Sequence, residues 1–327
     1  MIWTGKRSKR SKRSWSGGTC ATGGTLKATR RPRLSGRPSW LDKKLDFRIM
    51  HRTERALAGL SLHTVCHQAR CPNIAECFSR GTATFMIMGD ICTRGCAFCG
   101  VTKGVPMPLD PDEPGRVAEA VGRLGLRHAV ITSVTRDDLD DGGAGAFAAV
   151  IRALKRIDTS PAIEVLVPDF MGEDASIETV LDAGPDIFGH NIETVPSLYG
   201  ARKGGDYGRS LALLSRAKES SQGTRTKSAL MLGLGETHEE VLEVLGDLRR
   251  VGCDYVSLGQ YLQPARKNIP VAEYITPETF ERYRERALGI GFLHVESGPY
   301  VRSSYMADAY LPRESRYRPP GKRRDAP

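Results

Sequence analysis

The feature that most constrains the fold is a regular alternation of short apolar runs with stretches of helical apolar spacing. The short runs, rich in β-branched and aromatic residues, predict strands at 83–91, 128–134, 163–170, 186–193, 226–233 and 255–262. Apolar residues at helical spacing predict helices at 114–124, 144–157, 174–183, 210–218, 237–251 and 277–289. Because strands that alternate with helices form parallel βαβ units, we expect an α/β fold, a partial (β/α)6 TIM-like barrel. In such barrels the chemistry lies at the carboxyl ends of the strands.

This alternation divides the chain into four expected parts. Residues 1–37 are rich in Lys, Arg, Ser and Gly and predict a disordered basic tail. Residues 38–82 form an N-terminal extension that carries three cysteines, and residues 83–312 form the barrel with a C-terminal closing segment. Residues 313–327 are polar and Pro-rich and predict a flexible C-terminal tail.

The net charge of +10 belongs to the N-terminal tail. Residues 1–41 contain eleven Lys and Arg and no Asp or Glu, which leaves 37 basic and 38 acidic residues in 42–327. The body is therefore electrically balanced, and we expect no nucleic-acid partner. The longest apolar run covers about seven residues around 83–89. A membrane-spanning helix needs roughly 18, so we expect no membrane span.

The N-terminal tail also bears on location. It has no apolar region of the kind that a secretory signal contains, so we expect a cytoplasmic protein of bacterial type. An Arg- and Ser-rich segment without acidic residues is also typical of transit peptides, and the alternative location is therefore a mitochondrion or plastid. Clustered cysteines in a chain that is not secreted indicate metal or redox chemistry under reducing conditions.

Six of the eight cysteines lie between residues 66 and 99, in two groups of three. Cys92, Cys96 and Cys99 form a C-x3-C-x2-C motif directly after the first predicted strand. This tight spacing allows one loop to wrap one face of an iron–sulfur cluster. Ordinary four-iron clusters use four Cys, so three thiolates leave one iron open to a small molecule. The alternative is a zinc site completed by a distant His or Cys, although zinc sites usually contain paired C-x2-4-C motifs.

The second group has the spacing C-x4-C-x5-C and consists of Cys66, Cys71 and Cys77. It has no obvious fourth ligand. Cys20 lies in the tail, His67 is poorly placed inside the short loop, and Cys253 begins a predicted strand, where a buried free thiol is expected. The two groups could combine into one six-thiolate site. We expect two separate clusters instead, because the predicted strand 83–91 lies between them.

The C-x3-C-x2-C motif after the first strand resembles the radical S-adenosylmethionine (SAM) superfamily, and the additional upstream triad is similar to one family within it, the lipoyl synthases. The similarity extends over residues 37–310. Matching blocks occur at 82–87, 132–139, 164–170 and 259–264. A last block at 297–305 contains the sequence Arg302-Ser303-Ser304-Tyr305.

The resemblance implies a sulfurtransferase that inserts two sulfur atoms at C6 and C8 of an octanoyl chain, which a carrier protein bears as an amide on a lysine. Two molecules of SAM would be used. Cys92, Cys96 and Cys99 would hold the 4Fe–4S cluster whose open iron binds the SAM amino and carboxylate groups. A second, sacrificial 4Fe–4S cluster would supply the sulfur, held by Cys66, Cys71, Cys77 and the hydroxyl of Ser304. Ser303 has no assigned role.

Other residues are weaker candidates for contacts with SAM. Related enzymes use a glycine turn after the second strand for the amino group, and backbone after the fifth strand for adenine. A third glycine is missing from the latter turn, which argues against a dinucleotide site. The candidates are Phe98 in the cysteine loop, Gly142 and Gly143 after the second strand, Asn191 and Glu193 after the fourth, and Gly233 and Gly235 after the fifth.

The resemblance also implies partners. The expected substrates are octanoylated lipoyl carrier domains, namely 2-oxoacid dehydrogenase E2 subunits and the glycine cleavage H protein, and the expected electron donor is a ferredoxin or flavodoxin. We expect a monomer. The alternatives are another sulfur-inserting radical enzyme, acting on tRNA or dethiobiotin, and a non-catalytic iron–sulfur electron carrier. The second cysteine triad together with Ser304 argues against the former, and SAM binding would exclude the latter.

Overall fold

The computed structural model describes residues 38–41, 59–60, 62–64, 73–158, 161–221 and 223–310. The chain separates into two units, Met1–Ser35 and Gly36–Pro327, and every described residue belongs to the second. The two predicted tails lie outside the described residues, as do Cys20, Cys66, His67 and Cys71. The domain boundaries therefore stay predictions.

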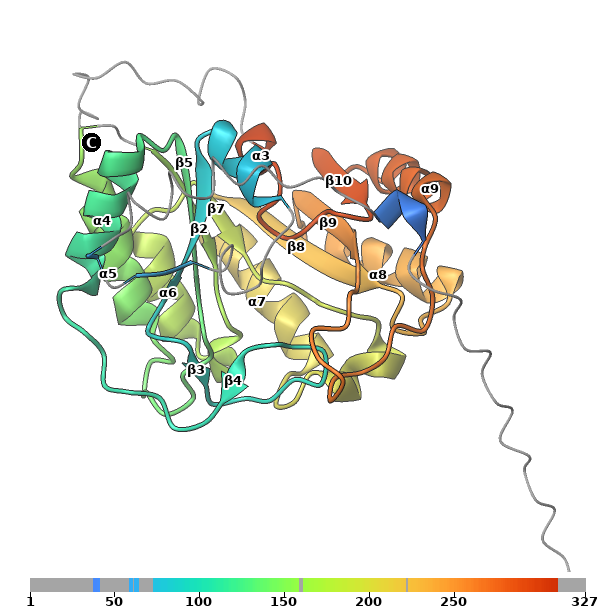
Figure 1. Ribbon diagram of the computed structural model, residues 1–327, viewed down its shortest axis with the longest axis horizontal. Coiled ribbons are helices and arrows are strands. Elements are labelled where there is room, and N and C mark those ends of the chain that lie inside the picture. Colours follow the sequence, from blue (N-terminus) through green and yellow to red (C-terminus); the bar gives the residue numbers. More distant parts are fainter. Residues whose placement is uncertain are drawn as a thin grey trace, which may run out of the picture. The chain divides into compact units, whose positions relative to one another are not determined.

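A large, mostly parallel sheet forms the centre of the second unit (Figure 1). Its strands lie in the order β1, β2, β5, β6, β7, β8, β9, β10. All neighbours pair in parallel except the short β1, which is antiparallel to β2. The bounds are β1 His63–Thr64, β2 Thr82–Ile87, β5 His128–Ser133, β6 Ala162–Leu166, β7 Ile187–Gly189, β8 Arg225–Leu232, β9 Tyr255–Gln260 and β10 His294–Gly298. Within the described ranges the ends of this sheet, β1 and β10, do not pair, so the barrel is open, as predicted.

One helix follows each of the parallel strands from β5 to β9, and together these helices form a layer outside the sheet (Figure 1). The helices are α3 Ile74–Ser79, α4 Glu113–Leu124, α5 Ala144–Lys155, α6 Asp174–Asp182, α7 Tyr207–Ser220, α8 His238–Arg250 and α9 Pro277–Gly289. Four short 3-10 helices lie at Ser39–Leu41 (η1), Phe170–Gly172 (η2), Pro196–Ala201 (η3) and Ala307–Ala309 (η4). None of the helices within these ranges is both long and apolar enough to cross a membrane.

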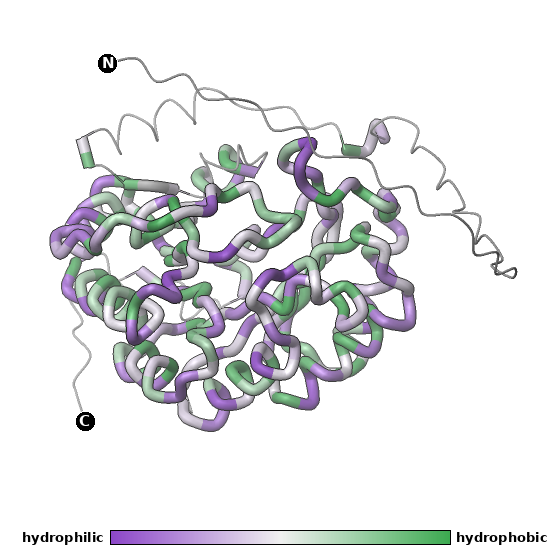
Figure 2. Tube along the Cα trace, turned by 90° about the horizontal axis from the view of Figure 1, so that it is seen from below, coloured by the Kyte–Doolittle hydropathy of each residue, from purple (hydrophilic) through white to green (hydrophobic). Residues whose placement is uncertain are grey.

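Helix starts follow local capping chemistry. Thr237 and Glu240 form a reciprocal capping box at the start of α8. The hydroxyl of Thr276 accepts a hydrogen bond from the Thr279 backbone at the start of α9, where Pro277 occupies the first turn. Figure 2 shows hydrophobic and hydrophilic stretches alternating along the chain, as expected for helices with one buried face.

The core lies between the sheet and this helical layer. All residues of β2 and β9 are buried, which is typical of parallel strands covered on both faces. The largest fully buried side chains from the two layers include Phe85, Ile131 and Phe188 of the sheet and Phe147 and Phe280 of the helices. This packing fixes the strand ends from which the loops of the candidate site project.

The structure differs from the predicted elements at several places. The third predicted strand, 163–170, ends at Leu166, and the short elements α3, β3 and β4 were not predicted. A seventh parallel strand, β10, lies where only a closing segment was predicted, because His294–Gly298 contains a single aliphatic residue, Val295. The first predicted strand ends at Ile87 rather than residue 91, since Met88 and Gly89 turn the chain with φ angles of 65° and 85°. The fourth ends at Gly189 rather than residue 193.

Candidate functional site

The cysteine loop lies at the carboxyl end of the parallel sheet (Figure 1). Cys92 belongs to strand β3, Ile91–Cys92, which pairs in parallel with β4, Thr102–Lys103. The Thr93 N–H donates to the carbonyl of Thr135 after β5 (3.1 Å), and the Ala97 N–H donates to that of Ala201 after β7 (2.8 Å). These bonds place the loop against segments that leave the strands at their carboxyl ends, where the barrel fold is expected to carry its chemistry.

An asparagine from the loop after β9 fixes the backbone around the last two cysteines. The Asn268 side-chain amide donates to the carbonyls of Ala97 (3.0 Å) and Cys99 (2.8 Å). The Cys99 N–H donates to the Cys96 carbonyl at 3.0 Å and closes the turn that contains Phe98, which is half-buried. Phe98 therefore shapes the loop, and its predicted contact with SAM stays a prediction.

A buried arginine inside the motif ties the cysteine loop to two further loops. The Arg94 guanidinium forms a two-point ion pair with Asp137 (2.7 and 2.8 Å) and contacts Asp169 Oδ1 at 2.7 Å. Asp169 is fully buried; burial alone would raise its pKa, but Arg94 lowers it below the usual range. These charge-assisted bonds hold the segment between Cys92 and Cys96 in one place.

The three thiols lie close together. Burial and the neighbouring Cys99 raise the pKa of Cys96 to about 11, and burial also raises that of Cys99. Cys92 contributes to both shifts. The sulfur atoms already receive backbone N–H groups, from Arg94 to Cys92 at 3.4 Å and from Val101 to Cys99 at 3.5 Å. Such N–H···S contacts favour the thiolate, the form that binds iron.

Three Cys in one loop form a donor set that fits an iron–sulfur cluster. Nowhere in the described ranges do three His, Cys, Asp or Glu side chains converge closely enough to hold one metal ion. A four-iron cluster takes each thiolate on a different iron, so three nearby Cys suffice and one iron stays open. Cys253, by contrast, is fully buried and its thiol donates to the Tyr255 carbonyl, as expected for a free thiol.

Asn191 and Glu193 lie beside the cysteine triad. Glu193 leaves β7 with a φ of 69° and forms an isolated bridge with Leu230 of β8. Its carboxyl group accepts a hydrogen bond from the Asn191 amide at 3.1 Å. Burial raises the pKa of Glu193, and its charge in turn raises the pKa values of Cys96 and Cys99. The structure thus brings these two predicted residues together with the triad.

The two glycine turns contain contacts that sequence reasoning did not predict. Gly142 and Gly143 have φ angles of 59° and 91°, and a Cβ on Gly143 would lie 2.4 Å from the Met88 sulfur. These positions therefore require glycine for backbone conformation and packing. Gly233 has a φ of 95° and a Cβ there would lie 2.3 Å from Gln260 and from the Glu273 carbonyl. Their predicted contacts with SAM stay predictions.

The second glycine turn also encloses its own carboxylate. The Glu236 side chain accepts hydrogen bonds from three successive backbone N–H groups, those of Gly233, Leu234 and Gly235. Such a nest of N–H groups is an anion-binding arrangement, and here Glu236 fills it. The turn is therefore rigid in shape, and the Gly233 carbonyl is bonded to the Ala272 N–H at 2.8 Å.

A buried arginine network next to Asn191 was not predicted. The Arg202 guanidinium donates to the Asn191 carbonyl (2.9 Å), to Tyr199 Oη (2.7 Å) and to Ser210 Oγ (3.1 Å), and also faces His190 Nε2 at 3.1 Å. Because a guanidinium donates and does not accept, Nε2 is the acceptor and Nδ1–H donates to the Val167 carbonyl. Burial and Arg202 lower the pKa of His190 to about 3.

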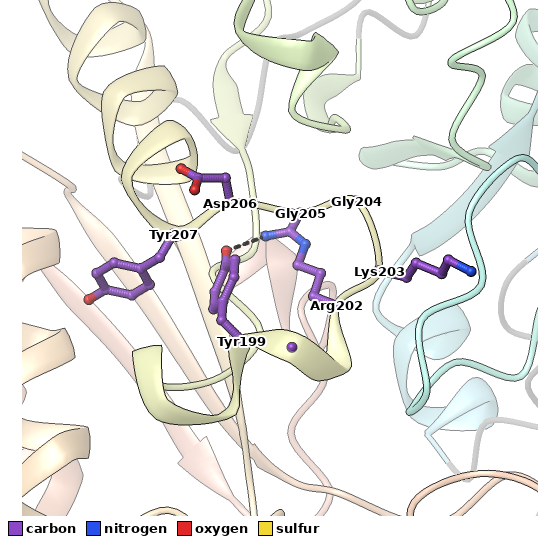
Figure 3. A pocket seen from close by; sticks show the side chains of 8 residues that line it. Tyr199, Arg202, Lys203, Gly204, Gly205, Asp206 and Tyr207 are labelled. Carbon is purple, nitrogen blue, oxygen red and sulfur yellow. Dashed lines mark hydrogen bonds between the residues drawn. The ribbon is translucent and has the colours of Figure 1, made fainter.

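A pocket of about 460 Å³ lies on the solvent side of this network (Figure 3). It is lined by residues 199–200 and 202–207, which connect η3 to α7. Figure 3 shows Arg202 bonded to Tyr199 inside it, with Lys203 directed away. The sequence carries no signal for this arrangement, because Arg202 lies in a loop that matched no predicted element.

The predicted ligand Ser304 lies on the segment that follows strand β10. We call residues 299–310 the strap. The hydroxyl of Ser303 donates to Asn191 Oδ1, in the segment after β7, at 2.5 Å. At the end of the strap the buried Tyr310 bonds to Ser257 of β9 at 2.6 Å and covers the Lys227 ammonium of β8 at 3.7 Å.

Between these ends the strap meets helix α3, which precedes β2 and carries Cys77. Tyr305 Oη donates to Glu76 Oε1 at 2.9 Å, and Arg80 forms a two-point ion pair with Asp308. Burial, the Glu76 carboxylate and the nearby Cys77 all raise the pKa of Tyr305. The structure therefore brings the segment of Ser304 to the helix of Cys77. Cys66 and Cys71, the other predicted ligands there, lie outside the described residues.

Comparisons with known proteins identify relatives over most of the chain. The Radical SAM superfamily model matches residues 86–248. The lipoyl synthase of Geobacter sulfurreducens is 57% identical over 274 residues, which is 84% of this chain and 90% of that protein. The lipoyl synthase of Geotalea uraniireducens is 56% identical over 278 residues, covering 85% and 98%. That of Caldanaerobacter subterraneus subsp. tengcongensis is 56% identical over 276 residues, covering 84% and 97%.

Solved structures with the same fold are much more distant in sequence. The crystal structure of HydG, a maturase of the [FeFe]-hydrogenase, matches with a TM-score of 0.51 at 13% identity, covering 76% of this chain and 67% of that one. The structure of Streptococcus suis SuiB bound to the precursor peptide SuiA matches with a TM-score of 0.52 at 13% identity, covering 76% and 60%. At this level of identity the likeness concerns the fold alone.

Proposed function

The chain belongs to the lipoyl synthase family of the radical SAM superfamily, and from this premise we propose how its residues divide the work of sulfur insertion. It is a lipoyl synthase, an enzyme that uses SAM and an iron–sulfur cluster and acts on a lipoyl carrier protein. The assignment of roles to single residues, the number of clusters and the choice of carrier are our proposal.

Cys92, Cys96 and Cys99 hold the cluster that binds SAM. The three thiols lie in one loop, two of them (Cys92 and Cys99) receive backbone N–H groups, and the motif contains no fourth protein ligand. When bound, this cluster and SAM supply a carbon radical that removes a hydrogen atom from an unactivated carbon. The protein's part is to hold the loop, which Asn268 and Arg94 do through the contacts described above.

Asn191 and Glu193 orient SAM beside this loop. Both are half-buried, they bond to each other, and Glu193 is close enough to Cys96 and Cys99 to raise their pKa values. A carboxylate and an amide offer acceptors for the ammonium of the methionine part or for ribose hydroxyls. Arg202 fixes the backbone of Asn191 through its carbonyl and so keeps both side chains in place.

Cys66, Cys71, Cys77 and Ser304 hold a second, sacrificial cluster that supplies the sulfur. The single observation that carries this proposal is the meeting of the strap with helix α3, which brings the segment of Ser304 to that of Cys77. A hydroxyl oxygen is a hard ligand for iron, and its bond is weak compared with that of a soft thiolate. A cluster bound here would supply the sulfur, and Ser304 would be its most easily released ligand.

The two proposed sites lie at different ends of the strands. The cysteine loop contacts segments that follow the carboxyl ends of β5 and β7, whereas Cys77 lies in the helix that precedes the amino end of β2. A carbon chain that reacts first near one site and then with sulfur from the other must reach into the barrel. A flexible octanoyl-lysine arm has this reach, because it is long, apolar and attached at one end. We propose that the E2 subunits of 2-oxoacid dehydrogenases and the glycine cleavage H protein present this arm, and that C6 and C8 are the positions modified.

The remaining proposals concern the setting of the reaction. We infer that a ferredoxin or flavodoxin supplies electrons and that the enzyme acts as a monomer in the cytoplasm, where thiols stay reduced. Size-exclusion chromatography with light scattering tests the monomer, and fractionation of cells tests the location. A dimer, or enrichment in an organelle, would contradict these two inferences.

An anaerobic assay tests the function. Reconstituted enzyme, reductant and SAM are mixed with an octanoyl-lysine peptide, and the peptide is analysed by mass spectrometry. We expect a gain of two sulfur atoms, which Cys71→Ala and Ser304→Ala each reduce while 5′-deoxyadenosine still forms. Release of 5′-deoxyadenosine from an unchanged peptide in the unmodified enzyme would contradict the substrate.

A further inference from the structure

Helix α3 and the strap, residues 299–310, are joined by polar contacts between side chains to which the proposed function gives no role of their own. The side-chain amide of Asn73 donates to the Tyr300 carbonyl at 2.6 Å. Tyr305 Oη donates to Glu76 at 2.9 Å. Arg80 contacts both oxygens of Asp308, at 3.0 Å through Nε and at 2.7 Å through the terminal nitrogen. We call the pairs Tyr305–Glu76 and Arg80–Asp308 the clamp.

The clamp contacts the Cys77 helix in its middle, at Glu76, and at its C-terminal end, at Arg80. Glu76 is the neighbour of Cys77 in α3, and Arg80 caps the end of the helix. On the strap, Tyr305 directly follows Ser304, while Ser303 on its other side is bonded to Asn191. Ser304 therefore lies between two side chains whose positions are fixed by hydrogen bonds to different parts of the barrel.

The far end of the strap is anchored as well. Tyr310 is buried, with its hydroxyl at 2.6 Å from Ser257 and its ring over the Lys227 ammonium. Lys227 is itself buried and paired with Glu164 at 2.9 Å. This anchor lies on β8 and β9, so it fixes where the strap ends. The position of Ser304 relative to α3 depends on the clamp and on the bond between Asn73 and Tyr300.

The geometry of the clamp suits a positioning task. A two-point contact between a guanidinium and a carboxylate defines a direction as well as a distance. Its two partners are 228 residues apart in the sequence, so the contact constrains chain segments that nothing local would hold together. A serine oxygen is a weak ligand for iron and cannot by itself keep a strap in place. Other contacts within the protein must therefore hold the strap in one conformation, because ordering the strap costs conformational entropy.

We propose that Glu76, Arg80, Tyr305 and Asp308 are positioning residues that hold Ser304 in place as the fourth ligand of the auxiliary cluster. The inference rests on the proposed function, in which Ser304 and Cys77 belong to that site. It adds that the retention of the cluster depends on contacts made by side chains that do not touch iron.

The test measures iron release from the reconstituted full-length enzyme to a chelator, while SAM cleavage is followed in parallel to monitor the other cluster. Asp308→Asn and Tyr305→Phe each remove part of the clamp with almost no change in shape. Each should speed the release of the auxiliary iron roughly tenfold, as the loss of a hydrogen bond to a charged group would. SAM cleavage should be unchanged. Glu178→Gln breaks the surface pair of Glu178 with Arg216 between α6 and α7 and is the matched control, with release at the normal rate.

A double-mutant cycle with Ser304→Ala distinguishes positioning from general loosening. If the clamp acts through Ser304, Asp308→Asn should add no further acceleration in the Ser304→Ala background. The exchanged pair Arg80→Asp with Asp308→Arg should restore slow release. Normal release in both clamp variants, or equal acceleration with and without Ser304, overturns the inference alone. Normal release in Ser304→Ala overturns the assignment of Ser304 and the inference with it.

Discussion

Arg94 lies between Cys92 and Cys96 in the sequence, and its guanidinium binds carboxylates from two different loops, Asp137 and Asp169. Arg94→Gln would leave the fully buried Asp169 with the more distant Arg209, at 3.3 Å, as its remaining ion-pair partner among the described residues. Removing one partner of a buried pair costs up to about 3–5 kcal/mol, so we expect the free energy of unfolding to fall, by less than this because Arg209 remains. Urea denaturation of the metal-free protein measures it. Arg216→Gln removes an exposed ion pair with Glu178 and should leave the urea midpoint unchanged. An unchanged midpoint for Arg94→Gln would contradict this role.

His190 provides a prediction on pH. Burial and Arg202 lower its pKa from 6.5 to about 3, so the unfolded chain takes up a proton at a higher pH than the folded one. The stability that His190 contributes is present above about 6.5 and is lost as the pH falls toward 3. His190→Gln should therefore flatten the pH dependence of the unfolding free energy between these values, measured by urea titrations at several pH values. An equally steep dependence in the variant would show that other groups cause it.

Among single residues, the sequence predicted those that belong to a recognisable motif, such as the cysteines. It missed those whose role depends only on their contacts in the folded protein. The spacing of Cys92, Cys96 and Cys99 was sufficient to place three thiols in one loop, where burial and the neighbouring thiols raise the pKa of Cys96 and Cys99. Arg202 could not be found in this way. Its role comes from a meeting with His190 and Ser210, which depends on how the loop before α7 folds back onto β7.

Among the elements, the strap depends on a close approach to β9. A Cβ on Gly259 would lie 2.1 Å from the Val301 carbonyl oxygen, which is backbone and cannot move alone. Gly259→Ala should therefore displace the strap and weaken its contact with α3. We expect faster hydrogen–deuterium exchange in residues 299–310 and reduced sulfur insertion, with SAM cleavage retained. Exchange at the normal rate throughout the strap would contradict this packing.

Gly246 in helix α8 is the matched control and a prediction in its own right. A Cβ at this position meets no atom within 4 Å. Alanine has a higher helix propensity than glycine, so Gly246→Ala should raise the free energy of unfolding by about 0.5–1 kcal/mol. Thermal or urea unfolding measures the change, and exchange in the strap should stay normal. A loss of stability would show that the helix surface is less open than the structure indicates.

Helices and strands were predicted correctly where the sequence has a clear hydrophobic pattern. They were missed where only pairing with another strand in the folded protein makes the segment a strand. The predicted helices 237–251 and 277–289 are present, and in the structure their starts are capped by Thr237 with Glu240 and by Thr276. Strand β10 carries the sequence HVESG and has no hydrophobic run, so only its pairing with β9 makes it a strand. The two-residue strands β3 and β4 were missed for the same reason, because each is too short to have a pattern.

In the whole molecule, the two proposed cluster sites lie at different ends of the barrel strands, and the strap contacts both regions. The cysteine loop rests on segments that follow β5 and β7, whereas Cys77 lies in the helix before β2. The strap touches both regions, through Ser303 with Asn191 and through Tyr305 with Glu76. Because the two groups of cysteines lie in separate segments of the chain, each site should assemble its cluster independently of the other, although the strap contacts both regions.

The iron content of two triple variants, together with SAM cleavage, tests this division most directly. Two four-iron clusters give about eight iron atoms per chain in the reconstituted enzyme. Replacing Cys92, Cys96 and Cys99 by Ala should remove half of the iron and abolish SAM cleavage. Replacing Cys66, Cys71 and Cys77 by Ala should also remove half, with SAM cleavage retained and sulfur insertion lost. Loss of all iron in either variant, or loss of SAM cleavage in the second, would contradict two separate sites.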